Sequence, residues 1–183
     1  MPATTVAKGL IDMKTLYKRL AALLFAFGVS MSCGAASAVA SEAALTVTEK
    51  GGDGQITAQH HFTMEDLQQM PRVGFDTATI WTSGVQQFAG VSLAHLLTTL
   101  ELPTDGDGVL TARAINDYSV EIPLADAVEG GPIVAYERNG AVMSLRDKGP
   151  LWIVYPFDSD PAYQTEAIYS RSIWQLEEIT VTK

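Results

Sequence analysis

Apolar and polar residues follow two periods along this 183-residue chain, and the period of two dominates. Alternation, or a short apolar run between turn residues, predicts strands at residues 44–50, 56–62, 74–81, 109–115, 118–123, 133–138, 151–155 and 173–183. The alternation at residues 44–50 is weak, which predicts an edge strand there. Many short strands with few helices indicate a single α+β domain that is dominated by β structure.

Helical spacing of apolar residues occurs in two places. Residues 64–70 follow Thr63, a good N-cap, and stop before Pro71, so a short helix is predicted there. Residues 91–100 carry Val and Leu at helical spacing, with Ser92 as the cap. A single helical turn is expected at residues 126–128, and Asn139-Gly140 predicts a hairpin between the flanking strands.

The first forty residues have the pattern of a secretory signal peptide. Lys14, Lys18 and Arg19 precede an apolar run at residues 20–29, and small residues lead to an A-x-A site that ends at Ala40. An uncleaved anchor and a lipoprotein signal at Cys33 are the alternatives, although the run is short for a membrane span. We therefore expect a signal peptide at residues 1–40, a folded domain at residues 41–183 and a periplasmic location.

The expected mature chain is strongly acidic. Its 143 residues hold 8 Lys and Arg against 20 Asp and Glu, a formal net charge of −12. Such a surface repels nucleic acid and anionic lipid, so we expect a ligand or partner that is not a polyanion.

The common catalytic signatures are absent from the sequence. The only cysteine, Cys33, leaves with the predicted signal peptide, so the mature chain would offer no thiolate. His60 and His61 are adjacent on a predicted strand and point to opposite faces, and no zinc motif accompanies them. No G-x-S-x-G, P-loop or dinucleotide fingerprint occurs. We predict neither a catalytic residue nor a metal site.

What remains is a set of polar and aromatic residues that suits a flat heteroaromatic ligand. Rings would stack on the ligand face, Asp117 would accept hydrogen bonds from an N–H pair on its edge, and Arg146 or Lys148 would meet a carbonyl or an anionic tail. Ordinary roles remain open: the tryptophans as core, residues 116–118 as an Asx-turn and residues 146–148 as a solvated loop. The candidate ligand-binding residues are Trp81, Asn116, Asp117, Tyr118, Arg146, Lys148, Trp152, Arg171 and Trp174.

Five separated segments, taken in order, resemble the molybdopterin-binding domain of the sulfite oxidase superfamily. They are Phe88-Ala-Gly-Val-Ser-Leu-Ala-His-Leu-Leu97, Ala114-Ile-Asn-Asp-Tyr-Ser-Val-Glu-Ile-Pro-Leu124, Ile133-Val-Ala-Tyr-Glu-Arg-Asn-Gly140, Lys148-Gly-Pro-Leu-Trp-Ile-Val-Tyr-Pro156 and Ser172-Ile-Trp-Gln-Leu176. The resemblance covers roughly residues 56–182. It implies the sulfite-oxidase type of β-rich fold and a pterin-type ligand.

The chain departs from the enzymes of that superfamily at the metal-binding position. Those enzymes carry a molybdenum-ligating cysteine at the end of the strand before the G-V-x-L helix, where this chain has Ile80-Trp81-Thr82. They also have an Arg after the Gly-Pro turn, where this chain has Leu151-Trp152, and a second domain that is missing here. A cysteine-free, PruR-like branch of small periplasmic proteins that bind a free pterin is more similar to this chain.

That second resemblance implies a non-catalytic pterin-binding protein, with no redox cofactor, that senses its ligand. It implies regulation of a membrane-bound protein of cyclic di-GMP synthesis and degradation, hence of biofilm formation, through that protein's periplasmic domain. In this hypothesis Asn116 and Asp117 bond the pterin edge, and the ring stacks on Trp81, Tyr118, Trp152 or Trp174. Arg146, Lys148 and Arg171 hold the carbonyl or side-chain end. The alternatives are a molybdopterin-dependent oxidoreductase or a subunit of one, and a scaffold that has lost its ligand.

Overall fold

The structure is a computed structural model that describes residues 42–182. The chain divides into two compact units, Met1–Val39 and Ala40–Lys183, and the described residues belong to the second. The predicted signal peptide, including Cys33, therefore lies outside the described residues. Within residues 42–182, no helix is both long and apolar enough to cross a membrane.

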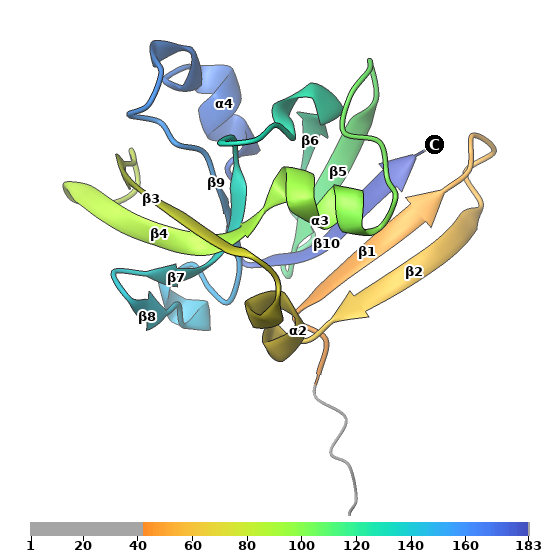
Figure 1. Cartoon of the computed structure of the whole chain (residues 1–183), viewed down its shortest axis with the longest axis horizontal. Coiled ribbons are helices and arrows are strands. Elements are labelled where there is room, and N and C mark those ends of the chain that lie inside the picture. The colour runs from red at the N-terminus through yellow and green to blue at the C-terminus, as the bar shows by residue number, and fades with distance from the viewer. Residues whose placement is uncertain (1–41, 183) are drawn as a thin grey trace, which may run out of the picture. The chain divides into compact units, whose positions relative to one another are not determined.

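The second unit consists of two five-stranded sheets with short helices between their strands (Figure 1). Its elements are β1 (Leu45–Lys50), β2 (Ile56–Phe62), α2 (Met64–Gln69), β3 (Arg72–Ala78), β4 (Val85–Ser92), α3 (Leu93–Thr99), β5 (Val109–Ala114), β6 (Ser119–Pro123), η1 (Leu124–Asp126), β7 (Ile133–Arg138), β8 (Ala141–Val142), η2 (Leu145–Asp147), β9 (Trp152–Val154), η3 (Pro161–Tyr163), α4 (Glu166–Arg171) and β10 (Leu176–Thr182). The η elements are single 3₁₀ turns. The predicted α+β class, rich in β structure, is confirmed.

The first sheet has the order β2-β1-β10-β5-β6. The strand predicted at residues 44–50 exists as β1, but the prediction that it is an edge strand is wrong. It lies between β2 and β10, and Leu45 and Val47 are fully buried. Its partner β10 runs parallel to it and comes from the other end of the chain, so no local pattern could reveal the pairing. The edge strands of this sheet are β2 and β6.

The second sheet has the order β3-β4-β7-β8, and β9 pairs with β7 as well. Strand β4 was not predicted, because its last residues were assigned to the following helix. Ser92 is the N-cap of α3, as predicted, but Val91 belongs to β4 and the helix begins at Leu93. Strand β3 ends at Ala78, short of the predicted residue 81. The Asn139-Gly140 hairpin between β7 and β8 is confirmed, with φ of 52° and 75° at its two turn residues.

Helix α2 begins with a reciprocal capping interaction. The backbone N–H of Asp66 donates to Oγ1 of Thr63 at 3.1 Å, and the backbone N–H of Thr63 donates to Asp66 Oδ2 at 2.8 Å. These bonds satisfy two of the free N–H groups at the helix start. The Thr63 hydroxyl and the Thr63 backbone N–H both donate to the Asp66 carboxylate, and this lowers the pKa of Asp66. The helix predicted at residues 64–70 is therefore confirmed, with its end at Gln69.

Strand β9 joins the two sheets. It pairs with β7 in the second sheet, and Trp152 forms an isolated antiparallel bridge with Trp174, just before β10 of the first sheet. The N–H of Ile153 donates to Ile173 O at 2.9 Å. Side chains of β9 and of the neighbouring residues 155 and 157 are almost completely buried in the core. This junction brings residues near 150 and near 173 together.

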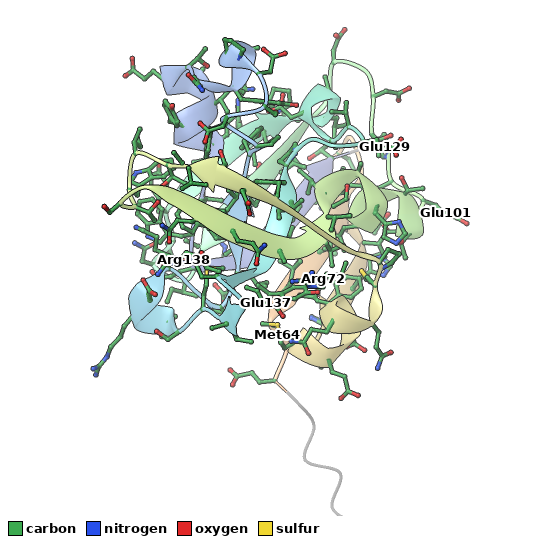
Figure 2. The ribbon with its side chains drawn as sticks, turned by 60° about the vertical axis from the view of Figure 1, so that its left-hand side comes forward. Met64, Arg72, Glu101, Glu129, Glu137 and Arg138 are labelled. Atoms are coloured by element: carbon green, nitrogen blue, oxygen red, sulfur yellow. The ribbon has the colours of Figure 1, made fainter. Side chains whose placement is uncertain are left out.

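Charged groups tie neighbouring strands at the surface. Figure 2 shows Arg72 on β3 beside Glu137 on β7; their Nη2 and Oε2 atoms are 2.7 Å apart, so the pair crosses over β4. In the other sheet, Arg113 on β5 and Thr48 on β1 both donate to Glu178 on β10, the strand between them. Each arrangement links three adjacent strands.

We predict that Gly90→Ala destabilises the protein by about 1–3 kcal/mol, because a side chain there overpacks the sheet. A Cβ on Gly90 would meet the backbone of Val134 and Ala135, with the Ala135 Cα at 2.6 Å. Urea unfolding measures the loss. The control is Gly51→Ala, whose Cβ would meet the rotatable Asp53 carboxylate at 3.0 Å and Thr57 Cγ2 at an ordinary 3.7 Å, and which should change stability by less than about 0.5 kcal/mol. Equal effects would contradict the close approach at Gly90.

A second prediction concerns Glu178 and acid. Burial raises the pKa of Glu178, but hydrogen bonds from Arg113 and Thr48 outweigh it and hold the pKa below the ordinary 4.5. A carboxyl group with a lowered folded-state pKa stabilises the fold above its unfolded pKa, and this contribution is lost as pH falls through the folded value. The free energy of unfolding, measured as a function of pH, should be lower for Glu178→Gln than for the wild type at pH 7. This difference should disappear below about pH 4.5. Glu121→Gln, at an exposed site on β6, should show no closing gap.

Candidate ligand-binding site

A cavity of about 320 Å³ lies beside the junction of the two sheets. Four segments form its wall: the loop after β3, the β5–β6 turn, α4 and the residues just before β10. The lining residues are Trp81, Ala114, Asn116, Tyr118, Tyr169, Ser170, Ser172, Ile173 and Trp174. The volume is at the lower end of the range of about 300–1,000 Å³ that is typical of small-molecule sites.

The aromatic part of the wall is centred on Trp81. Its ring makes edge contacts with the rings of Trp174, Trp152 and Tyr169, at centroid distances of 5.6, 5.9 and 6.0 Å. The backbone N–H of Trp81 donates to Oγ1 of Thr79 at 3.1 Å, which fixes the loop after β3. Trp81 and Trp174 are both half-buried, so each offers part of a ring to the cavity.

Trp152 supports this wall from the core and does not line the cavity. Its side chain is fully buried, and its Nε1 donates to Ser172 Oγ at 3.0 Å. The Ser172 hydroxyl in turn donates to the carbonyl oxygen of Ile153 at 2.7 Å. The ring lies edge-on to both Trp81 and Trp174. The ordinary role that the sequence left open for a tryptophan, a place in the core, describes Trp152.

Lys148 lies behind Trp174. Its Nζ is 3.8 Å from the ring centroid of Trp174 and 5.5 Å from that of Trp152, a cation–π arrangement with two rings. Its backbone carbonyl accepts a hydrogen bond from the N–H of Gln175 at 3.2 Å. Burial lowers the pKa of Lys148 below its ordinary value, and the nearby Arg138 lowers it further. Lys148 therefore contacts a lining residue without lining the cavity.

The β5–β6 turn contributes Asn116 and Tyr118 to the cavity, but Asp117 lies outside the lining set. Oδ1 of Asn116 accepts a hydrogen bond from the backbone N–H of Tyr118 at 3.3 Å, which is the Asx-turn considered above. Asp117 has a left-handed backbone, with φ of 65°. Its side chain is 88% exposed, and its Oδ1 is 3.2 Å from Nη1 of Arg113.

The two arginines of the candidate set also lie outside the lining. Arg171, the last residue of α4, donates through Nη1 to Asp126 Oδ2 at 2.9 Å. The hydroxyl of Tyr155 donates to the same oxygen at 2.7 Å, and burial together with this bond raises the pKa of Tyr155. This network ties α4 to η1. Arg146 is exposed on η2.

Five lining residues were not among the candidates from the sequence: Ala114, Tyr169, Ser170, Ser172 and Ile173. Tyr169 was visible as an aromatic residue close to Trp174 in the sequence. The serines carry no sequence signal, because their place depends on helix α4 (Glu166–Arg171), whose sequence has no clear apolar period. Thr165 caps this helix by accepting from the N–H of Ile168 at 3.3 Å.

The cavity wall is neutral, because none of its nine lining residues carries a charge. The described residues also contain no cluster of three His, Cys, Asp or Glu side chains that could hold a metal ion. His60 bonds Glu49 at 2.9 Å and His61 bonds Thr46 at 3.1 Å. The cavity can therefore bind a ligand through ring contacts and neutral hydrogen bonds, and its residues include no thiolate.

A second cavity of about 340 Å³ lies on β3 and β4. Arg72, Asp76 and Gln87 are among its lining residues, and the Arg72 guanidinium is already paired with Glu137. It contains none of the candidate residues. The first cavity combines rings with neutral polar groups, so it is the better site for a flat heterocycle.

Comparison with known proteins gives a family match and a likeness to solved structures. The family described as "Oxidoreductase molybdopterin binding domain" matches residues 38–158, more than half of the chain. The solved structure of the sulfane dehydrogenase SoxCD from Paracoccus pantotrophus is 17% identical, with a TM-score of 0.55. The match covers 75% of this chain and 38% of that chain, and at this identity it shows the fold alone. No curated protein matches the sequence.

We predict that Ser172→Ala destabilises the fold by about 1–3 kcal/mol, because it leaves the buried indole N–H of Trp152 and the carbonyl of Ile153 without their partner. The matched control is Ser170→Ala in the same cavity wall. Ser170 Oγ bonds only the local carbonyl of Ala167, so this change should cost less than about 0.5 kcal/mol. Urea unfolding of both variants measures the difference. A cost for Ser172→Ala no larger than that of the control would contradict the supporting role of Ser172.

Proposed function

Because this chain belongs to the oxidoreductase molybdopterin-binding domain family, we propose that it is a non-catalytic protein that binds a free pterin. We further propose that it belongs to the cysteine-free, PruR-like branch and acts as a periplasmic ligand sensor. In that role it regulates a membrane-bound protein of cyclic di-GMP synthesis and degradation. The location depends on the signal peptide predicted at residues 1–40.

The observation that carries the proposal is the composition of the cavity wall. Trp81 and Trp174 offer rings, while Asn116, Tyr118 and the serines of α4 and its C-terminal end offer neutral polar atoms. A pterin is a flat, neutral bicycle whose faces stack on aromatic side chains and whose edge carries hydrogen-bonding groups. The wall supplies both kinds of contact within one cavity of ligand size.

The donor set of the described residues does not fit a metal that is held by a cysteine thiolate. Residues 42–182 contain no cysteine, and Trp81 stands where the enzymes of the superfamily, by the resemblance above, carry their ligand. We therefore derive no oxidation or oxygen-transfer step for this chain. Trp81 and Trp174 supply a stacking surface. Trp152 packs against the Trp81 ring, and the Lys148 ammonium lies over the Trp174 ring.

We predict that Trp81→Leu weakens binding of a reduced pterin about five- to tenfold, since loss of one ring contact is worth on the order of 1–1.5 kcal/mol. Calorimetry of the purified mature chain with tetrahydrobiopterin measures the affinity, and the circular dichroism of each variant checks its fold. The control is Phe62→Leu on β2, which lies outside the cavity lining and should leave the affinity unchanged. Unchanged binding in Trp81→Leu would remove the stacking role.

The alternative, a molybdopterin-dependent oxidoreductase or a subunit of one, has a separate test. Protein isolated from its native cell compartment would be analysed for molybdenum and for any small molecule that copurifies. Stoichiometric molybdenum would favour the alternative, whereas a copurified pterin without metal supports the proposal. A folded protein that binds neither would indicate a scaffold that has lost its ligand.

A further inference from the structure

We infer that the cavity recognises the hydrogen-bond acceptor edge of its ligand, and that Asn116 reads that edge as a donor. This inference rests on the proposed function and deepens it, because it names the ligand's chemistry: a neutral bicycle that presents a carbonyl oxygen to the β5–β6 turn. It differs from the recognition expected from the sequence, in which Asp117 accepts from a donor edge.

The orientation of the Asn116 amide is set by the turn. A backbone N–H can donate only to an acceptor, so the atom that bonds the N–H of Tyr118 at 3.3 Å must be the amide oxygen of Asn116. The amide nitrogen of the same side chain has no partner among the described residues. Since Asn116 lines the cavity, the group it has left for a ligand is an NH₂ donor.

The carboxylates near the cavity are not available to read a donor edge. Asp117 lies outside the lining and pairs with Arg113, which also bonds Glu177 and Glu178. Asp126 accepts from both Arg171 and Tyr155. No carboxylate stands among the lining residues.

The two serines of the wall are left as acceptors and supply no donor. The Ser170 and Ser172 hydroxyls already donate to the carbonyl oxygens of Ala167 and Ile153, so toward a ligand each offers only an oxygen. A tyrosine hydroxyl such as that of Tyr118 donates or accepts by rotating, and it cannot discriminate by itself. Among the described lining residues, Asn116 is therefore the side chain whose local bond fixes it as a donor.

The experiment compares two pteridines of the same shape. Pterin carries a carbonyl on its pyrimidine ring, and diaminopteridine carries an amino group in place of that carbonyl. Titrations at pH 7.5 would follow the tryptophan fluorescence of the mature chain. The wild type should bind pterin about two- to tenfold more tightly, because only pterin offers a carbonyl oxygen to the exposed Asn116 amide.

The informative variant is Asn116→Asp, which keeps an oxygen for the N–H of Tyr118 and therefore keeps the Asx-turn. It replaces the NH₂ donor by an acceptor, so the preference should reverse in favour of diaminopteridine. Asp117→Asn in the same turn, outside the lining, is the matched control and should keep the wild-type preference. Circular dichroism would check that both variants fold.

Each outcome of the titrations is decisive for one of the two proposals. Failure of wild-type protein to bind any pteridine, reduced pterins included, would overturn the proposed function. Pterin binding without a preference over diaminopteridine, or a preference that Asn116→Asp leaves unchanged, would overturn the role of Asn116 and leave pterin binding intact. Loss of the preference in Asp117→Asn would indicate that Asp117, and not Asn116, bonds the edge of the ligand.

Discussion

The backbone pairing between β9 and the residues just before β10 is the constraint on which the site depends. The N–H of Ile153 donates to Ile173 O, and the N–H of Leu176 donates to Leu151 O at 3.0 Å, so two segments that are about twenty residues apart are held side by side. Trp152 and Trp174 meet across this pairing, and Ser172 bonds the indole of the first. The cavity lies beside this pairing because lining residues 172–174 connect α4 to β10 here.

The neutral cavity wall follows from where the nearby charges are used. Lys148 is drawn onto the face of Trp174, and the Arg171 guanidinium is held by Asp126. Each cation has a partner, and neither is among the residues that line the cavity. The turn before the apolar strand β9 is polar because it places Lys148 against the two tryptophans. The ammonium group of Lys148 is partly desolvated there.

Local patterns predicted most of the elements but not the connections between distant ones. The capping residues Thr63 and Ser92 and the Asn139-Gly140 turn are local signals, and the structure has each of them. Strand β4 was missed because its last two residues fit the helical spacing of the segment at residues 91–100, and the interior position of β1 depends on β10. Trp81, Asn116, Tyr118 and Trp174 were found in the sequence as polar and aromatic residues next to turns, whereas the serines near α4 depend on a helix without a clear apolar period.

The turn at residues 116–118 shows why residue type alone does not give the chemistry of a site. An aspartate next to aromatic residues suggests an acceptor for a ligand's N–H groups, but the left-handed backbone at Asp117 accompanies a carboxylate that points to Arg113 and solvent. The amide oxygen of Asn116, the preceding residue, accepts a hydrogen bond within the turn, so its NH₂ group is the part left for a ligand. The group available to a ligand is therefore the NH₂ donor of Asn116 and not the carboxylate acceptor of Asp117. In the proposed pterin site, the polarity of recognition therefore follows from the hydrogen bonding of the turn, and the edge that Asn116 would bond is the opposite one from the edge that the sequence suggests for Asp117.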